Sequence, residues 1–336
     1  MPTKQHTAQP NGRRPKIVTI GGGTGHFTLL SGLKKHDVDI TAIVSMMDNG
    51  GSTGELRDEL GVLPPGDLRQ CLVALSDADL VMRQLFAHRF DRGKLAGHTC
   101  GNLLISALEQ ITGSIDEAVL RAGDILKIRG RVVPVTRDQA QLVMTLRNGK
   151  VLKGEHAIDF YQLISRFGVA SIKLSPKAKL NPEALWAIKE ADAIVVGPGD
   201  LYTSILPNFL ISGMPAAIRN AKAKKIFVGN LMNKHGQTDN MEVNDYIDVF
   251  TNVVGAPFFT HAIYNTTKVP SALLTRYLDE GEPVLCEPTE GESGPIYVGA
   301  PLLATRAPKR VKGDKLARSY IRHDQEKLAE VIVGLV

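Results

Sequence analysis

Short apolar runs alternate with helix-length amphipathic segments along most of this chain of 336 residues. Apolar runs of about four to eight residues bounded by glycine or polar residues are typical of buried strands. Their alternation with helices predicts an α/β fold, a Rossmann-like, mostly parallel sheet with helices on both faces. The strands that the pattern predicts are Lys16–Ile20, Asp39–Met46, Ser171–Leu174, Ala193–Gly197, Lys225–Asn230 and Pro257–Ile263.

Two regions depart from this alternation. Residues 67–128 are helix-like almost throughout and predict a helical insertion, with helices at Asp67–Leu75, Ala78–Phe90, Asn102–Ile111 and Ser114–Ile128. Residues 131–155 predict a small antiparallel β patch at the edge of the sheet, with a tight turn at Asn148-Gly149. Its expected strands are Arg131–Val135, Gln141–Arg147 and Lys150–Glu155.

The two ends of the chain and its cysteines narrow the class of protein. Residues 1–14 are polar and contain no acid, so we expect a disordered tail before a single domain of residues 15–336. The three cysteines are widely spaced and give no disulfide framework, which favours a reducing cytoplasm. No run of about 18 apolar residues occurs, so we expect no membrane span.

The formal net charge of +5 is unevenly distributed. Basic residues concentrate in the first 14 residues and in residues 306–322, which leaves the rest of the chain net acidic. Aromatic residues make up only 5% of the chain, and no nucleic-acid module is recognisable, so we expect no nucleic-acid partner. The second basic run is either a solvated face or part of a site for an anionic ligand.

Glycine is concentrated directly after the first predicted strand. Strand, glycine turn and helix form a cradle for phosphate, because glycine lets backbone N–H groups approach the ligand and the helix N-terminus adds positive charge. The dinucleotide fingerprint is absent, since His26 stands where its third glycine should be, and no Walker A motif occurs. A tight turn alone is the alternative. The residues of the cradle are Gly21, Gly22, Gly23, Thr24 and Gly25.

Further loops of small and hydrogen-bonding residues follow other predicted strands or open helices. Because the carboxyl ends of parallel strands meet at one edge of a sheet, we expect these loops to share one ligand crevice. Asp67 is interpreted as a helix N-cap, with Arg69 one turn further on and able to meet a phosphate. The candidate residues of these loops are Asp48, Asn49, Gly50, Gly51, Ser52, Thr53, Arg69, Gly101, Asn102, Gly197, Gly199, Asp200, Thr203, Ser204, Asn230, Asn233 and Thr238.

Taken together, the motifs resemble those of the YvcK-type gluconeogenesis factors, a branch of the superfamily that includes 2-phospho-L-lactate transferase (CofD). The resemblance runs from about residue 16 to residues 322–324. It is carried by Gly-Gly-Gly-Thr-Gly at 21–25, Met-Asp-Asn-Gly-Gly-Ser-Thr-Gly at 47–54, Leu-Pro-Pro-Gly-Asp at 63–67, Gly-Asn at 101–102, Gly-Pro-Gly-Asp-Leu-Tyr-Thr-Ser at 197–204 and Asn-Leu-Met at 230–232.

The resemblance implies a cytoplasmic regulator that binds a UDP-sugar such as UDP-N-acetylglucosamine. Such proteins support cell shape and cell-wall synthesis during growth on gluconeogenic carbon sources. The resemblance also implies that Tyr277 stacks on the nucleobase and that Arg322 pairs with the diphosphate. A regulator needs a protein partner, which the sequence does not identify, and we expect a homodimer as the default assembly.

The resemblance leaves a Mg²⁺-dependent transferase open as the alternative. The transferase moves a phospholactyl or phosphoenolpyruvyl group from a guanylylated donor to a deazaflavin alcohol. Asp48 would then be the catalytic carboxylate, and Asp48 and Asp200 would bind the metal. The transferase motif ends in paired aspartates where this chain has Asp48-Asn49, so we favour a non-catalytic binding protein with Mg²⁺ as the one cofactor to consider. The missing fingerprint disfavours an NAD(P) oxidoreductase.

Overall fold

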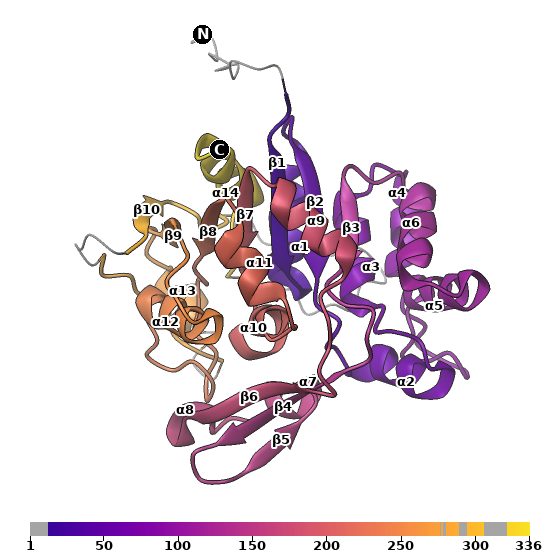
Figure 1. Cartoon of the computed structure of the whole chain (residues 1–336), viewed down its shortest axis with the longest axis horizontal. Coiled ribbons are helices and arrows are strands. Elements are labelled where there is room, and N and C mark those ends of the chain that lie inside the picture. Colours follow the sequence, from indigo (N-terminus) through magenta and orange to yellow (C-terminus); the bar gives the residue numbers. More distant parts are fainter. Residues whose placement is uncertain (1–12, 276, 278–279, 289–293, 306–320) are drawn as a thin grey trace.

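The computed structural model describes residues 13–275, 277, 280–288, 294–305 and 321–336. Within them a seven-stranded parallel sheet of order β10-β9-β8-β7-β1-β2-β3 forms the centre of the molecule (Figure 1). This confirms the predicted α/β class, although the last strand was not predicted. The strands are β1 (Lys16–Gly21), β2 (Asp39–Val44), β3 (Arg131–Pro134), β7 (Ala193–Val196), β8 (Lys224–Val228), β9 (His261–Asn265) and β10 (Ile296–Ala300).

The strand order reverses between β1 and β7. The chain winds outward from β1 to β3, returns to place β7 beside β1, and then winds outward on the other side to β10. The register pairs Ile17 with Ala193 and Ile20 with Val196, so the carboxyl ends of the two strands are level. Ligands of doubly wound sheets bind in the crevice outside this point of reversal.

Helices cover both faces of the sheet, as predicted. Helices α1, α3 and α14 pack together on one face, whereas α9, α11 and α12 pack on the other (Figure 1). The central strands are therefore buried on both sides, which explains their continuous apolar sequences. The helices on the two faces are α1 (Gly23–Leu33), α3 (Gly66–Leu75), α9 (Pro182–Glu190), α11 (Met214–Asn220), α12 (Val243–Val254) and α14 (Gln325–Gly334).

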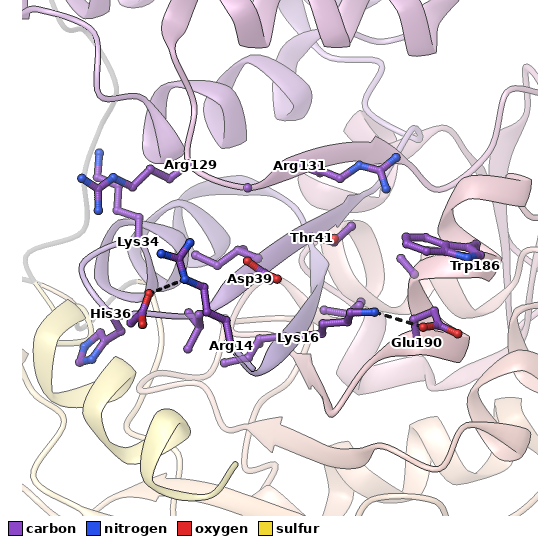
Figure 2. A pocket seen from close by; sticks show the side chains of 17 residues that line it. Arg14, Lys16, Lys34, His36, Asp39, Thr41, Arg129, Arg131, Trp186 and Glu190 are labelled. Atoms are coloured by element: carbon purple, nitrogen blue, oxygen red, sulfur yellow. Dashed lines mark hydrogen bonds and ion pairs between the residues drawn. The ribbon is translucent and has the colours of Figure 1, made fainter. Parts of the chain in front are cut away.

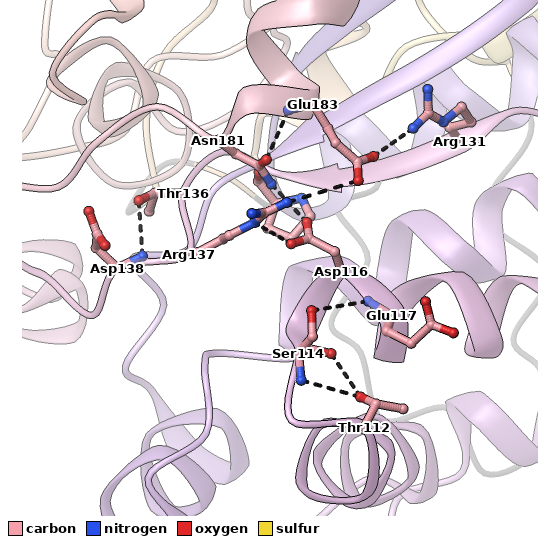
Figure 3. A network of polar contacts seen from close by, with 11 residues as sticks. Thr112, Ser114, Asp116, Glu117, Arg131, Thr136, Arg137, Asp138, Asn181 and Glu183 are labelled. Carbon is pink, nitrogen blue, oxygen red and sulfur yellow. Dashed lines mark hydrogen bonds and ion pairs between the residues drawn. The ribbon is translucent and has the colours of Figure 1, made fainter.

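Residues between β2 and β3 are elaborated with helices. Each of the four helices predicted within residues 67–128 is present, with bounds shifted by a few residues. Ser114 caps the last of them, since its hydroxyl accepts a hydrogen bond from the Glu117 N–H at 3.5 Å (Figure 3). Besides α3, the helices of this region are α2 (Gly51–Leu60), α4 (Leu80–Ala87), α5 (Cys100–Thr112) and α6 (Ile115–Leu126).

The predicted antiparallel patch was partly wrong. Residues 131–134 form the edge strand β3 of the large sheet and pair in parallel with β2. Ser171–Leu174, predicted as a strand of the large sheet, belongs to the small sheet and pairs antiparallel with β4. The small sheet has the order β5-β4-β6 and lies beyond the carboxyl ends of the large sheet's strands (Figure 1). Its strands are β4 (Gln141–Leu146), β5 (Val151–Lys153) and β6 (Val169–Ser175).

Burial explains this misassignment. The last three residues of β3 are all buried, as in a core strand, whereas β6 exposes most of its residues and fully buries only Leu174. The hairpin between β4 and β5 was predicted correctly, and Gly149 takes a φ of 85° in its turn. The remaining elements are short: α7 (Glu155–Asp159), α8 (Ile164–Phe167), α10 (Leu206–Phe209), α13 (Ser271–Leu274) and the π-helical turn η1 (Leu201–Ile205).

A polar network joins the edge strand β3 to the flanking helices α6 and α9 (Figure 3). The Asn181 side chain donates to the carboxylate of Asp116 at 2.8 Å and to the carbonyl of Pro134 at 3.0 Å. Arg131 pairs with Glu183 at 2.6 Å, and Arg137 pairs with Asp116. The network therefore links the amino ends of α6 and α9 to β3.

Two predictions about the ends of the chain lie mostly outside the described residues. They are the disordered tail, of which only Arg13 and Arg14 are described, and the basic run, of which only residues 321 and 322 are described. Across the part of the chain that the structure describes, no helix combines the length and apolarity needed to cross a membrane.

Candidate functional site

The glycine loops after β1 and β7 lie against each other at the point of strand reversal. A Cβ atom on Gly25 would stand 2.4 Å from the carbonyl oxygen of Pro198, and one on Gly199 would stand 3.4 Å from the carbonyl oxygen of Gly22. Only glycine allows the first of these approaches, because the obstacle is backbone that cannot rotate away. The predicted convergence of these two loops is thus present in the structure.

The loop after β7 continues into the π-helical turn η1. Its Ile205 N–H donates to the Asp200 carbonyl at 3.1 Å, and the Ser204 hydroxyl lies 3.7 Å from where a Cβ on Gly23 would stand. Such turns are frequent at functional sites. Among the described residues, the buried hydroxyls of Thr203 and Ser45 have no hydrogen-bond partner. Both lie at the carboxyl edge of the sheet, where polar groups without partners call for a ligand or water.

A pocket of about 740 Å³ opens beside these loops, and we call it the carboxyl-edge pocket. Its volume lies within the range of small-molecule sites, roughly 300–1,000 Å³. Asn230 supports its wall, since its amide donates to the Gly199 carbonyl at 2.9 Å and accepts from the Gly199 N–H at 3.1 Å. The candidate residues that line it are Thr24, Gly25, Arg69, Gly199, Asp200, Asn230 and Arg322, and its apolar lining includes Phe27, Val73, Ala87, Leu231 and Met232.

A chain of polar contacts holds Arg69 in place and reaches the loop of residues 48–53, which follows β2. Its Nε donates to Asn102 Oδ1 at 2.9 Å, and Asn102 Nδ2 donates to the Ser52 hydroxyl at 3.2 Å. Gly101 makes room for the arginine, since a Cβ there would stand 2.7 Å from Arg69 Cδ. Arg69 is 4% exposed, so its guanidinium enters the pocket wall as an oriented cation rather than a mobile one.

Asp67 is the main residue that the sequence interpretation assigned wrongly. Helix α3 begins at Gly66 with Pro65 as its cap, and no side chain caps it. Asp67 Oδ1 instead accepts a hydrogen bond from the Gly23 N–H at 3.0 Å. A Cβ on Gly22 would stand 2.2 Å from Asp67 Oδ2, so the carboxylate occupies the space that the glycine leaves. Asp67 therefore orients the first glycine loop.

Half-buried carboxylates gather around Asp67. Burial and the charges of Asp48 and Asp200 raise the pKa of Asp67 to about 7. Burial and the neighbouring carboxylates, Asp48 first, raise the pKa of Glu155 to about 8. Burial also raises the pKa of Asp48 above its ordinary value. Carboxylates of perturbed pKa are typical of functional sites, and of this cluster Asp200 lines the carboxyl-edge pocket. Glu155 was missed because it ends a predicted hairpin, where nothing local marks it.

These carboxylates could hold Mg²⁺ only together with oxygen ligands from a bound phosphate and from water. In the described ranges, no group of three or more His, Cys, Asp or Glu side chains is arranged to hold a metal ion. Magnesium in nucleotide sites commonly takes one or two carboxylates and completes its shell with phosphate and water. The charge of Asp48 is the first among those that raise the pKa of Asp67, so these two carboxylates suit that role. Asp200, the second metal ligand expected from the resemblance, pairs with Lys234 at 3.4 Å.

Asn233 and Thr238 hold their own loop together. Asn233 accepts from the Tyr246 hydroxyl at 2.8 Å, and Thr238 Oγ1 accepts from the Lys234 N–H at 2.8 Å. Neither residue is among those that line the carboxyl-edge pocket. Their direct contact with a ligand stays a prediction.

Tyr277 and Arg322 differ in their placement. Tyr277 is 7% exposed in a small apolar cluster, and its hydroxyl accepts from the Ile321 N–H at 3.3 Å. Ile321 and Leu231 of the same cluster line the carboxyl-edge pocket, so Tyr277 lies behind its wall. Arg322 lines the pocket itself. The proposed stacking and pairing roles of the two residues stay predictions.

Fold and pocket define a doubly wound α/β protein whose ligand crevice lies at the point of strand reversal. The family model described as 2-phospho-L-lactate transferase CofD matches residues 17–293. The chain belongs to this CofD family, and within it to the group of proteins named gluconeogenesis factor.

Similar proteins support this assignment along nearly the whole chain. The gluconeogenesis factor of Bacillus subtilis is 37% identical over 328 residues, which cover 97% of this chain and 99% of that protein. The gluconeogenesis factor of Listeria monocytogenes is 41% identical over 263 residues, 78% of this chain and 80% of that protein. A crystal structure of a UPF0052 family protein from Bacillus halodurans has a TM-score of 0.85 at 33% identity, and covers 96% of this chain and 99% of its own.

Proposed function

We propose that the carboxyl-edge pocket binds a nucleotide diphosphate of the UDP-sugar type and that the protein acts as a cytoplasmic regulator. One observation carries this proposal: the loops at Gly25 and Pro198 meet at the point of strand reversal and border a pocket of about 740 Å³. The backbone N–H groups of the first loop and the N-terminus of α1 would face the diphosphate.

The cationic and amide side chains of the pocket supply the remaining contacts of the proposed complex. Arg69 and Arg322 line the pocket and suit bidentate pairing with phosphate oxygens. Asn230 is already committed to Gly199, so its part is to fix the loop rather than to read the base. The apolar lining around Leu231 and Met232 would cover the uridine or sugar ring.

The regulatory part of the proposal follows the relatives' name, gluconeogenesis factor. We infer that ligand binding reports the supply of a cell-wall precursor and that the bound form acts on a protein partner. Control of cell shape and cell-wall synthesis during gluconeogenic growth would be the physiological outcome. A homodimer is the assembly that we expect.

Calorimetry tests the proposal most directly. UDP-N-acetylglucosamine and UDP are expected to give saturable heat with the purified chain, whereas NADH gives none. Gly23→Val should abolish that heat, because Gly23 takes a φ of 68° that a β-branched residue adopts only with strain, so the loop beside the predicted phosphates must change its path. Circular dichroism should show that the rest of the fold is kept. The proposal fails if no UDP compound binds, and unchanged affinity in Gly23→Val would remove the loop from the site.

The carboxylate cluster favours a second candidate, a Mg²⁺-dependent transferase of the CofD type. Asp48 and Asp67 could hold an ion against a nucleotide phosphate, which would place an acceptor hydroxyl near a carboxylate of raised pKa. Deazaflavin alcohol, a guanylylated acid and Mg²⁺ would be offered to the protein. Product formation that disappears in Asp48→Asn would support the transferase. If the protein forms no product, the transferase is excluded and the nucleotide-binding regulator is the candidate that stays.

A further inference from the structure

A second pocket lies at the opposite edge of the large sheet, far along the strands from the glycine loops. Its volume is about 580 Å³, and we call it the amino-edge pocket. It is lined by the first residues of β1, β2 and β3 and by helix α9, together with the chain after α1 (Figure 2). None of the candidate residues named above lines it. The pocket therefore calls for an explanation of its own.

One end of the amino-edge pocket is cationic. Figure 2 shows Arg129 and Lys34 side by side there, and Arg14 reaches toward the same end. The Lys34 side chain is only 16% exposed and donates to the Ser76 carbonyl at 2.6 Å. Burial lowers the pKa of Lys34, and the charges of Arg83 and Arg129 lower it further, although Asp77 opposes them. This is an environment that a bound anion would relieve.

The present partners of these cations hold them weakly. Arg14 pairs with Asp37, whose side chain is 81% exposed, at 2.6 Å. Lys34 stands 3.9 Å from Asp77, which also pairs with Arg129. The pairs of Arg14 with Asp37 and of Arg129 with Asp77 are exposed and contribute only about 0–1 kcal/mol each, so a phosphate could replace these two carboxylates at little cost. Arginine guanidinium groups bind phosphate oxygens bidentately.

The other end of the amino-edge pocket has an aromatic platform. Trp186 of α9 is 54% exposed, and the Lys16 ammonium and the Arg131 guanidinium each lie 5.7 Å from its ring centre. The face of an indole ring is electron-rich and attracts the polarised C–H face of a sugar ring as well as cations. Glu190 lies beside it, and Asp39 lies between the two ends in Figure 2.

This combination selects a class of ligand. Carboxylates accept hydrogen bonds from hydroxyl groups, the tryptophan covers a ring, and the arginines and Lys34 hold a phosphate. We propose that the amino-edge pocket is a second binding site, and that it takes a phosphorylated sugar with its ring on Trp186 and its phosphate at Arg129 and Lys34. This site is separate from the proposed nucleotide site and does not depend on it.

The chain carries its own reporter for this test, because Trp186 is its single tryptophan. Glucose 6-phosphate would be titrated into the full chain while tryptophan emission and calorimetric heat are recorded. We expect a saturable change in both signals. Glucose alone should give none, and inorganic phosphate should bind at least about tenfold more weakly, since it lacks the ring contact.

Two variants and a matched control complete the test. Arg129→Ala should weaken glucose 6-phosphate binding by about tenfold or more, because it removes a charge-assisted contact with the phosphate. Arg131→Ala should weaken it by a similar factor, because the Arg131 guanidinium lies beside the Trp186 ring and would donate hydrogen bonds to hydroxyl groups of the sugar. Both side chains are about half exposed, so the fold is not at risk. Arg121→Ala is the control, because Arg121 is equally exposed on α6 but lies outside the pocket.

Several outcomes would overturn the proposal. They are the absence of saturable heat with glucose 6-phosphate, equal affinity for inorganic phosphate, and binding that survives in both pocket variants. UDP-N-acetylglucosamine would be titrated in the same series as an independent arm. If it binds normally to Arg131→Ala, a failed sugar-phosphate titration counts only against the amino-edge pocket and leaves the nucleotide proposal intact.

Discussion

The two edges of the large sheet are built from the same strands but provide opposite chemistry. At the carboxyl edge, two glycine loops meet near half-buried carboxylates, and the local structure is fixed by contacts such as Gly25 on Pro198. At the amino edge, exposed cations and Trp186 surround a pocket whose ion pairs can exchange. A site built from backbone is rigid and intolerant of substitution, whereas a site built from long side chains tolerates it.

Gly25→Ala gives the largest expected effect on this contrast. The added Cβ would stand 2.4 Å from the Pro198 carbonyl oxygen, so the two loops must separate. Binding of UDP-N-acetylglucosamine should be lost, and the free energy of unfolding should fall by about 1–3 kcal/mol. Calorimetry and thermal unfolding measure the two effects. Gly334→Ala is the control, since nothing lies within 4 Å of its added Cβ.

Measuring both ligands with one arginine variant from each pocket tests whether the two edges of the sheet bind independently. Arg322→Ala should weaken the nucleotide about tenfold and leave glucose 6-phosphate unchanged, whereas Arg131→Ala should do the reverse. Each arginine lines one pocket and not the other. Calorimetry of both ligands with both variants gives four numbers. A loss of both ligands in either variant would show that the two pockets are not independent.

The pH dependence of stability should come from the carboxyl edge. A raised pKa means that folded Asp67 holds its proton more tightly than the unfolded chain, so stability is present at low pH and declines from about pH 4 to about pH 7. Asp67→Asn keeps an oxygen for the Gly23 N–H but removes the titration. Thermal midpoints measured across that range should therefore change less in the variant.

A matched carboxylate provides the control for this measurement. Asp58 is 68% exposed and pairs with its neighbour Arg57. Asp58→Asn should leave the slope of the thermal midpoint against pH as it is in the parent chain. An unchanged slope in Asp67→Asn would mean that Asp67 does not carry the pH dependence.

The smallest effect is expected at the amino edge. Trp186→Phe should change the free energy of unfolding by no more than about 0.5 kcal/mol, because the side chain is 54% exposed. Its effect on sugar-phosphate affinity should exceed its effect on stability. Denaturant unfolding and calorimetry compare the two. A large loss of stability would show that Trp186 serves the fold and not a ligand.

The sequence predicted the parts of the molecule that local patterns determine. Buried strands such as Ala193–Val196 have continuous apolar sequences, and glycine loops follow them directly. Parallel sheets then bring those loops to one edge, so the convergence of the loops after β1 and β7 followed from topology, whereas the particular contact between Gly25 and Pro198 did not. The four glycines within residues 21–25 also identified the loop after β1, although the sequence does not show which residues this loop contacts.

Long-range contacts explain what was missed. Asp67 looks like a helix cap locally, and its bond to Gly23 joins segments 44 residues apart. The sequence also does not show that the folded loop uses polar atoms of Asn233 and Thr238, whose contact with a ligand stays a prediction. No sequence motif pointed to the amino-edge pocket, because Lys34, Arg131 and Trp186 lie far apart in the chain and only the folded sheet brings them together.

Helix α1 runs from one pocket to the other. Thr24 and Gly25 in its first turn line the carboxyl-edge pocket, and Lys34, which ends the helix, lines the amino-edge pocket. Its 11 residues span only about 16 Å. If a ligand bound in one pocket shifts α1 and thereby changes the affinity of the other pocket, the ligand of the other pocket must change the affinity of the first pocket by the same factor.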